Sequence, residues 1–113
     1  MSAAVTPYKA IADRTRRLIL DALREESLSA GAIAQRFPKM SRPAVSKHLA
    51  ILRRSRLVVM KKRGRERLYA LNAAPLRDVS EWVHQYEVAW DGQLQSLKRY
   101  VESESKEEPD AES

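Results

Sequence analysis

Apolar positions recur at helical spacing through the first third of this chain. Thr6 followed by Pro7 predicts a short helix with Thr6 as its N-cap, and Asp13 predicts the cap of a second helix that ends at about Glu25. The apolar residues of this second helix fall on one face: Leu18, Ile19, Ala22 and Leu23. The cations on its exposed face, which are either solvated or close to phosphates, are Arg14, Arg16 and Arg17.

Two more helices are predicted over 30–37 and 41–54, and only Pro38, Lys39 and Met40 separate them. Ser29 and Ser41 stand where N-caps are expected, and Pro43 is tolerated in the first turn of the later helix. The inward face of that helix is a narrow stripe at i, i+4 and i+7, made of Val45, Leu49 and Leu52. So tight a connection is typical of a helix-turn-helix, although spacing alone also fits an ordinary helix pair.

After residue 54 the pattern changes from helical to extended. Residues 57–60 are apolar and partly β-branched, and residues 68–71 resume a strand-like pattern. The charged residues between them predict a β-hairpin that turns near Gly64 and Arg65. A basic hairpin tip suits a minor groove or flanking phosphates, and a plain solvated hairpin is the simpler alternative.

The last predicted element is a helix from Pro75 to about Ser103, roughly 27 residues and about 40 Å long at 1.5 Å per residue. Its apolar residues step by three or four, close to a heptad seam: Leu76, Val79, Val83, Tyr86, Trp90, Leu94, Leu97 and Val101. One small domain is too small to cover this stripe, so the sequence predicts burial against a second copy. We predict one domain over 1–103 and a disordered acidic tail over 104–113.

Charge is distributed unevenly along the chain. The formal net charge is +6, yet residues 36–67 hold twelve Lys or Arg against the single Glu66, while residues 101–113 hold six acids and one Lys. A basic centre favours a polyanionic partner, and without a long apolar run a membrane is not expected. We expect no signal peptide and a cytoplasmic location.

Composition also limits the chemistry that the chain can perform. There is no cysteine, which excludes disulfides, thiolate metal ligands and thiol redox switching. Two histidines, with no Gly-rich phosphate loop and no paired buried carboxylates, argue against an enzyme.

The order of these elements and several short motifs resemble the ArsR/SmtB family of winged-helix transcriptional repressors. The motifs are Ile11 to Leu20 (IADRTRRLIL), the Val-Ser-x-His-Leu-x-x-Leu pattern at 45–52, and Gly64-Arg65 followed by Tyr69-Ala70-Leu71. The resemblance implies a mainly α fold with a small β-hairpin, namely a winged helix-turn-helix with a long C-terminal dimerisation helix. It also implies a homodimer, clasped by the first and last helices, that binds a pseudo-palindromic operator in double-stranded DNA and represses transcription.

Two sets of site residues follow from the motifs and the resemblance. Family members place DNA contacts at the positions of Arg42, Pro43, Ser46 and Lys47, although Pro43 stands where a hydroxyl is common. The full predicted set of DNA contacts is Arg42, Pro43, Ser46, Lys47, His48, Arg53, Lys62, Arg63, Gly64, Arg65 and Arg67. For His48 we predict a hydrogen bond to phosphate or backbone. The predicted dimer interface consists of Tyr8, Val83, Tyr86, Trp90, Leu94 and Leu97.

The sensing sites of the family are incomplete in this sequence. One class needs a Cys-x-Cys pair, which is absent; another needs an Asp-x-His pair, where this chain has Leu71 and Ala73. Only His84 and Glu87 match the second half of that motif. We therefore predict no cofactor, no metal site and no metal or thiol sensing. An organic effector beside the aromatic residues is left open, as are two alternatives to a repressor: an architectural DNA binder and a winged-helix protein-interaction module.

Overall fold

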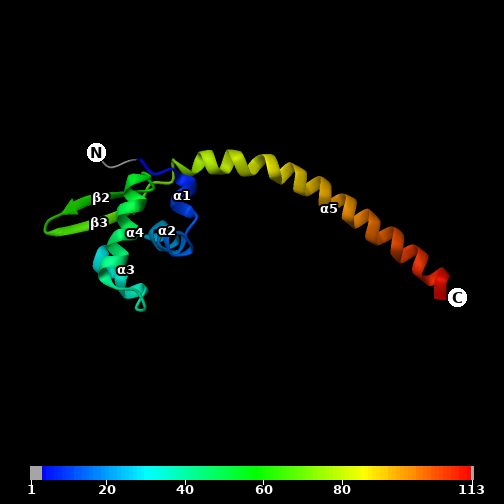
Figure 1. The fold of residues 1–113 in the computed structure, drawn as a ribbon, viewed down its shortest axis with the longest axis horizontal. Helices are drawn as coiled ribbons and strands as arrows, with labels where there is room; N and C mark the ends of the chain where they lie inside the picture. The colour runs from blue at the N-terminus through cyan, green and yellow to red at the C-terminus, as the bar shows by residue number, and fades with distance from the viewer. Residues whose placement is uncertain (1–3, 113) are drawn as a thin grey trace. The chain divides into compact units, whose positions relative to one another are not determined.

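The computed structural model describes residues 4–112, with side chains described for residues 4–105. The elements follow in the order α1 (Pro7–Ile11), α2 (Arg14–Glu25), β1 (Leu28–Ser29), α3 (Ala30–Arg36), α4 (Arg42–Arg54), β2 (Val58–Arg63), β3 (Glu66–Leu71) and α5 (Leu76–Glu112) (Figure 1). The chain divides into two units, residues 1–79 and residues 80–113. The first unit holds a winged helix-turn-helix and the second most of α5. Within the described part, no helix has the length and apolar character needed to cross a membrane.

Side-chain caps set the starts of the helices, as predicted. The N-caps Thr6, Asp13, Ser29 and Ser41 each accept the backbone N–H of the residue three positions on, at 2.9–3.2 Å. These bonds satisfy backbone donors that have no partner inside the helix. Pro43 lies in the first turn of α4, where its missing N–H costs no helical bond.

The predicted hairpin is present and belongs to a larger sheet. β2 and β3 pair antiparallel in a register that sets Val58 against Leu71 and Arg63 against Glu66, and Gly64 makes the turn with φ of 63°. We call this β2–β3 ribbon the wing; it projects from the helices of its unit (Figure 1). The third strand, β1, pairs with β3 and gives the strand order β1-β3-β2. The hairpin prediction misses β1, because two residues are too few to show an alternating pattern.

The core lies between the helices of the first unit and one face of the sheet. It consists of Ala10, Ile19, Leu20, Leu23, Leu28, Ile33, Val45, Leu49, Leu52, Leu57 and Val58. The predicted inward stripe of α4 is therefore confirmed: Val45, Leu49 and Leu52 are all buried. Burial of this stripe fixes which face of α4 points outward.

The end of α4 directs the chain into the wing. The N–H of Arg56 donates to the carbonyl of Arg53 at 3.0 Å, and the N–H of Leu57 donates to that of Leu52 at 3.1 Å. This is a Schellman ending, in which the left-handed residue is usually glycine. Here it is Arg56, with φ of 66°, and the side-chain amide of Asn72 donates to its carbonyl at 2.8 Å.

The last helix is longer than the sequence predicts. α5 runs to Glu112, whereas the pattern predicts its end at about Ser103 and a disordered tail over 104–113. Between Gly92 and Pro109 no residue breaks a helix, so nothing in the sequence stops it at 103. Ser113 lies outside the described residues.

Candidate nucleic-acid interface

The outward face of α4 is polar and cationic. It consists of Arg42, Pro43, Ser46, Lys47, Ala50, Arg53 and Arg54, all exposed. These positions are three or four residues apart and form one stripe along the helix. α4 carries no acidic residue, so nothing on the helix neutralises this face.

Arg42 lies where α3 and α4 meet. A Cβ built on Gly31, in the first turn of α3, would lie 3.5 Å from Nη1 of Arg42. The guanidinium therefore rests beside the backbone of α3, at the N-terminal end of α4. Ser41 Oγ accepts the Ala44 N–H and Pro43 has no N–H, so the Arg42 guanidinium is the main donor that this end of α4 offers to an anion.

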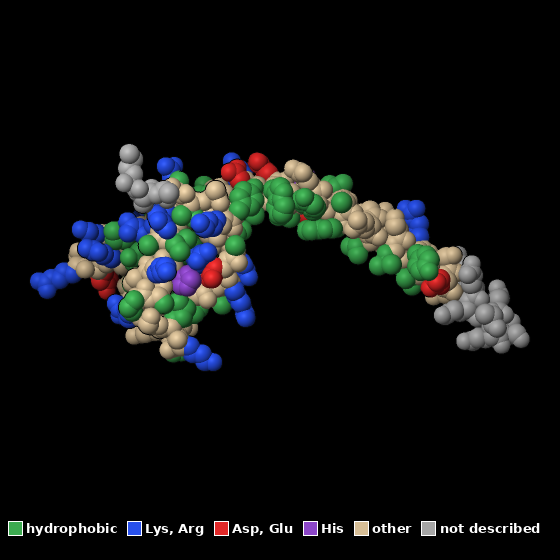
Figure 2. Space-filling view, viewed as in Figure 1, with side chains coloured by type: hydrophobic (Ala, Val, Ile, Leu, Met, Phe, Trp, Pro, Cys, Tyr) green, Lys and Arg blue, Asp and Glu red, His purple; other side chains and the backbone are tan. Residues whose placement is uncertain are grey.

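Cations crowd the tip of the wing. Lys61, Lys62, Arg63, Arg65 and Arg67 are all exposed, and Figure 2 shows Lys and Arg side chains gathered on this ribbon. Arg63 faces Glu66 across the strands, but Lys62 faces Arg67. Like charges directly opposite each other destabilise a hairpin and strengthen its attraction for an anion.

A cleft of about 620 Å³ separates the second half of α4 from β2. It is lined by Ala50, Arg53, Arg54, Val58, Val59 and Met60. Arg53 belongs to the predicted DNA contacts, whereas Arg54, Val59 and Met60 do not. The sequence signal for Arg54 was its place on the outward stripe, four residues after Ala50.

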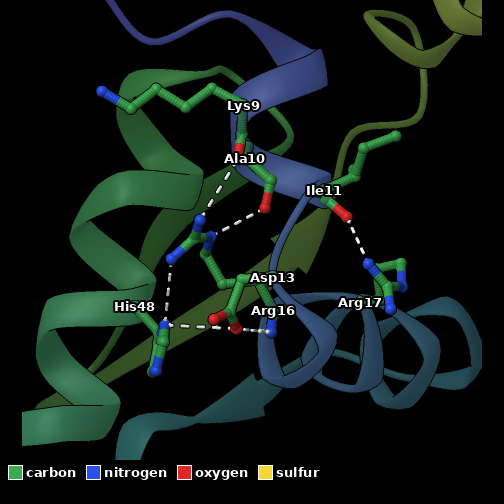
Figure 3. A network of polar contacts seen from close by, with 7 residues as sticks. All are labelled: Lys9, Ala10, Ile11, Asp13, Arg16, Arg17 and His48. Carbon is green, nitrogen blue, oxygen red and sulfur yellow. Dashed lines mark hydrogen bonds and ion pairs between the residues drawn. The ribbon is translucent and has the colours of Figure 1, made fainter.

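His48 lies at the edge of the cationic face, next to the buried stripe. Its side chain is only 20% exposed, and its Nδ1 lies 3.4 Å from Nη1 of Arg16 and 3.9 Å from a carboxylate oxygen of Asp13 (Figure 3). The sequence predicts a hydrogen bond from His48 to phosphate or backbone; in the DNA-free structure its Nδ1 contacts the Arg16 side chain, and Nε2 has no part in that contact. The contact joins residues 32 positions apart, so no local pattern could have revealed it.

The same cluster perturbs one carboxyl group. The backbone N–H of Arg16 donates to Asp13 at 2.9 Å and holds the pKa of that carboxyl below its usual value, while partial burial opposes the effect. The Arg16 guanidinium contributes a smaller lowering effect. Asp13 therefore favours its charged form at the start of α2.

The second unit exposes an apolar stripe. Of the predicted dimer residues on α5, Tyr86, Trp90, Leu94 and Leu97 are 44–62% exposed, and Val83 is half-buried. The rings of Tyr86 and Trp90 lie 6.4 Å apart, and a groove of about 370 Å³ runs beside Trp90, Gln93, Leu94 and Leu97. Figure 2 shows hydrophobic side chains along this helix. Contiguous exposed apolar surface of this kind marks interaction sites.

His84 and Glu87, which match half of the family's metal-binding motif, contact each other. Nδ1 of His84 lies 3.3 Å from Glu87 on the exposed surface of α5. Among the side chains described, no group of three or more His, Asp or Glu could hold a metal ion.

Comparison with known proteins decides the family. A family model described as "Helix-turn-helix domain" matches residues 11–61. The chain is 40% identical over 76 residues to the transcriptional repressor SdpR of Bacillus subtilis, which covers 67% of this chain and 83% of SdpR. It is 35% identical to the structure of an ArsR-like transcriptional regulator from Rhodococcus sp. RHA1, with a TM-score of 0.67 over 85% of this chain and 87% of the other. The chain belongs to the ArsR family.

As a member of the ArsR family, this chain is a transcriptional regulator whose helix-turn-helix binds double-stranded DNA. The family confirms the prediction that it is not an enzyme. The family does not fix the direction of regulation, because a second relative is named as a transcriptional activator. That relative is HlyU of Vibrio cholerae, 36% identical over 81 residues, or 72% of this chain and 74% of HlyU.

Proposed function

We propose that this ArsR-family regulator is a homodimeric repressor that reads a specific, pseudo-palindromic operator with α4 and the wing. The observation that carries the proposal is the outward face of α4, which is cationic along its whole length and carries no acid. A helix of this kind fits the major groove, where Ser46 and Arg42 reach base edges and the remaining cations hold phosphates. The wing tip then occupies the adjacent minor groove.

The cleft between α4 and β2 supports a proposed path for the DNA backbone. A helix in the major groove and a ribbon tip in the neighbouring minor groove lie on either side of one phosphodiester strand. The cleft is the surface that joins these two elements, and Arg53 and Arg54 line it. We propose that these two arginines hold the phosphates of that strand.

Dimerisation is supported by the exposed stripe on α5. Trp90 is 49% exposed and Leu94 62% exposed. Burial of such large apolar side chains against a partner lowers the free energy of the complex. We propose that a second copy of this chain covers the stripe. Two-fold symmetry then sets two half-sites about 10–10.5 base pairs apart, or a multiple of that distance.

The proposal also covers whether the protein represses or activates transcription, and which signal regulates it. SdpR, the more similar of the two named relatives, is a repressor, and we propose the same role here. We also propose regulation without metal or thiol sensing, since His84 and Glu87 supply two ligands where zinc takes four. An organic effector in the groove beside Trp90 stays open, and we keep the cytoplasm as the expected compartment.

The test is selection from a pool of random duplexes, followed by competition binding between the selected duplex and random DNA. Arg42→Ala is predicted to cost about 1–3 kcal/mol at one operator position and to affect random DNA much less. Arg24→Ala, which removes the same charge from an exposed position on α2, is the matched control and leaves both affinities unchanged. Selection that returns no shared sequence would favour an architectural DNA binder over a repressor.

A further inference from the structure

The C-terminal end of α1 is held by arginines from α2. Nε of Arg16 donates to the carbonyl of Ala10 at 2.7 Å, and Nη2 of the same residue donates to that of Lys9 at 3.2 Å. Nη1 of Arg17 donates to the carbonyl of Ile11 at 2.7 Å (Figure 3). Carbonyls in the last turn of a helix lack the usual donor four residues on and attract cations; that of Lys9 also accepts the Ala12 N–H at 3.3 Å. Two guanidinium groups therefore fix α1 on the start of α2.

The Arg16 guanidinium also reaches the recognition helix α4. Its Nη1 lies 3.4 Å from Nδ1 of His48. Arginine carries only donors, so Nδ1 accepts this bond and the proton of the neutral ring is on Nε2. Asp13 is 3.9 Å from the same nitrogen, too far for a hydrogen bond, and instead accepts the backbone N–H of Arg16. Three helices thus meet at one side chain.

The position of His48 on α4 gives this contact its significance. His48 directly follows Ser46 and Lys47 of the outward face, while Val45 and Leu49 on either side of it are buried. Apolar packing holds α4 against the core, but apolar contacts are non-directional and do not by themselves specify one rotation of the helix about its axis. A directional bond at the edge between the two faces limits that rotation.

At its other end, α1 is attached to the first turn of α5. The hydroxyl of Tyr8 donates to the carbonyl of Asp78 at 3.0 Å. Tyr8 is also one of the predicted dimer residues. α1 therefore contacts both the element proposed to form the dimer and, through Arg16, the element proposed to read DNA.

We propose that Arg16 and His48 are positioning residues, which couple the placement of α1 to the orientation of α4 in the DNA groove. The inference rests on the proposed function, because it assigns the effect to operator binding. It replaces the direct DNA contact predicted for His48 with an indirect one. Loss of the bond lowers operator affinity without removing any atom that touches DNA.

The first test uses a conservative substitution that keeps the acceptor. In His48→Asn the amide oxygen takes the place of Nδ1, whereas His48→Leu fills similar space without an acceptor. The contact is longer than a typical hydrogen bond and is present in the free protein, so its net energy sets an upper limit: we expect a loss of affinity for the selected duplex of up to about tenfold in His48→Leu, and less than twofold in His48→Asn. In an Arg16→Gln background, His48→Leu is expected to cost less than twofold further, since the bond is already absent. Circular dichroism ensures that all variants are compared while folded.

Several results would overturn the proposal. Wild-type affinity in His48→Leu would show that the contact is not needed. Equal losses in His48→Leu and His48→Asn, with recovery in His48→Gln, would show that Nε2 touches DNA directly. Full additivity with Arg16→Gln would show that the two residues act separately.

A second measurement needs no DNA and separates this inference from the proposed function. The ¹⁵N chemical shifts of the His48 ring report which nitrogen carries the proton. The contact with Arg16 predicts the Nε2–H tautomer in the free protein, and a change of the Nδ1 shift in Arg16→Gln. A protonated Nδ1 that does not respond to Arg16→Gln would contradict the contact, whether or not the wild-type chain selects a duplex.

Discussion

The like-charge pair on the wing gives a prediction in which stability and DNA binding move in opposite directions. Lys62 and Arg67 face each other across the strands, on the face of the ribbon that carries buried Val58 nearer the core. Cross-strand pairs in a sheet are worth about 0.2–1 kcal/mol, and like charges directly opposite each other destabilise it, so we take a cost within this range. Arg67→Gln keeps a long polar side chain and removes one charge, so it is predicted to stabilise the fold by that amount. For a domain of this size the melting temperature rises by roughly 1–6 °C.

The same substitution weakens DNA binding through the loss of one phosphate contact. Each contact contributes about 0.9 to the slope of log K against log salt, so the slope flattens by about 0.9 and affinity falls about eightfold at 0.1 M salt. Fluorescence anisotropy across a salt series measures both quantities, and thermal melting measures stability. Arg63→Gln is the matched control, because Arg63 faces Glu66: it also weakens binding, but it does not stabilise the fold. A less stable Arg67→Gln, or one with an unchanged salt slope, would refute the reasoning.

Two further predictions concern the dimer and the cap of α2. Replacing Tyr86 and Trp90 with Glu places charges in the exposed α5 stripe. The variant is predicted to be a monomer in sedimentation equilibrium and to bind the operator much more weakly. A wild type that sediments as a monomer at micromolar concentration would exclude the dimer. The pKa of Asp13 is lowered on folding, so its carboxylate stabilises the fold above the unfolded pKa of about 3.9, and this contribution disappears as pH falls through the lower folded value. Asp13→Asn keeps the cap without the charge. Urea unfolding from about pH 3 to 7 is therefore predicted to give a larger free energy of unfolding for the wild type at neutral pH, and a difference that decreases as the pH falls. A pH-independent difference would assign the effect to the cap alone.

Local signals in the sequence account for most of the fold. Ser41, Pro43 and the Val45–Leu49–Leu52 stripe predict the start and the buried face of α4, because a cap and a helical period depend only on neighbours a few positions away. The wing is predicted for the same reason, since Gly64 and the strands around it are local. β1 is missed because it depends on pairing with β3 rather than on its own two residues.

The residues of the candidate site also fall into those that local sequence signals predict and those that depend on long-range packing. The outward cations of α4 and the wing are predictable, because exposure follows from the position of the buried stripe. The partner of His48 is not, since it lies on another helix, and the role of Arg16 as a clamp on α1 depends on that same long-range packing. From the sequence, Arg16 is predicted to be a surface cation like Arg14 and Arg17. Only the three-dimensional structure shows its contact with His48.

Chemical footprinting of the selected duplex tests the central claim most directly, namely that α4 reads the major groove and the wing the minor groove in a two-fold complex. Dimethyl sulfate reports guanine N7 in the major groove and adenine N3 in the minor groove. We predict two symmetric blocks of N7 protection, with centres about 10–10.5 base pairs apart or a multiple of that, each flanked by minor-groove protection. Protection that is absent from both grooves, or confined to a single asymmetric block, would contradict the account.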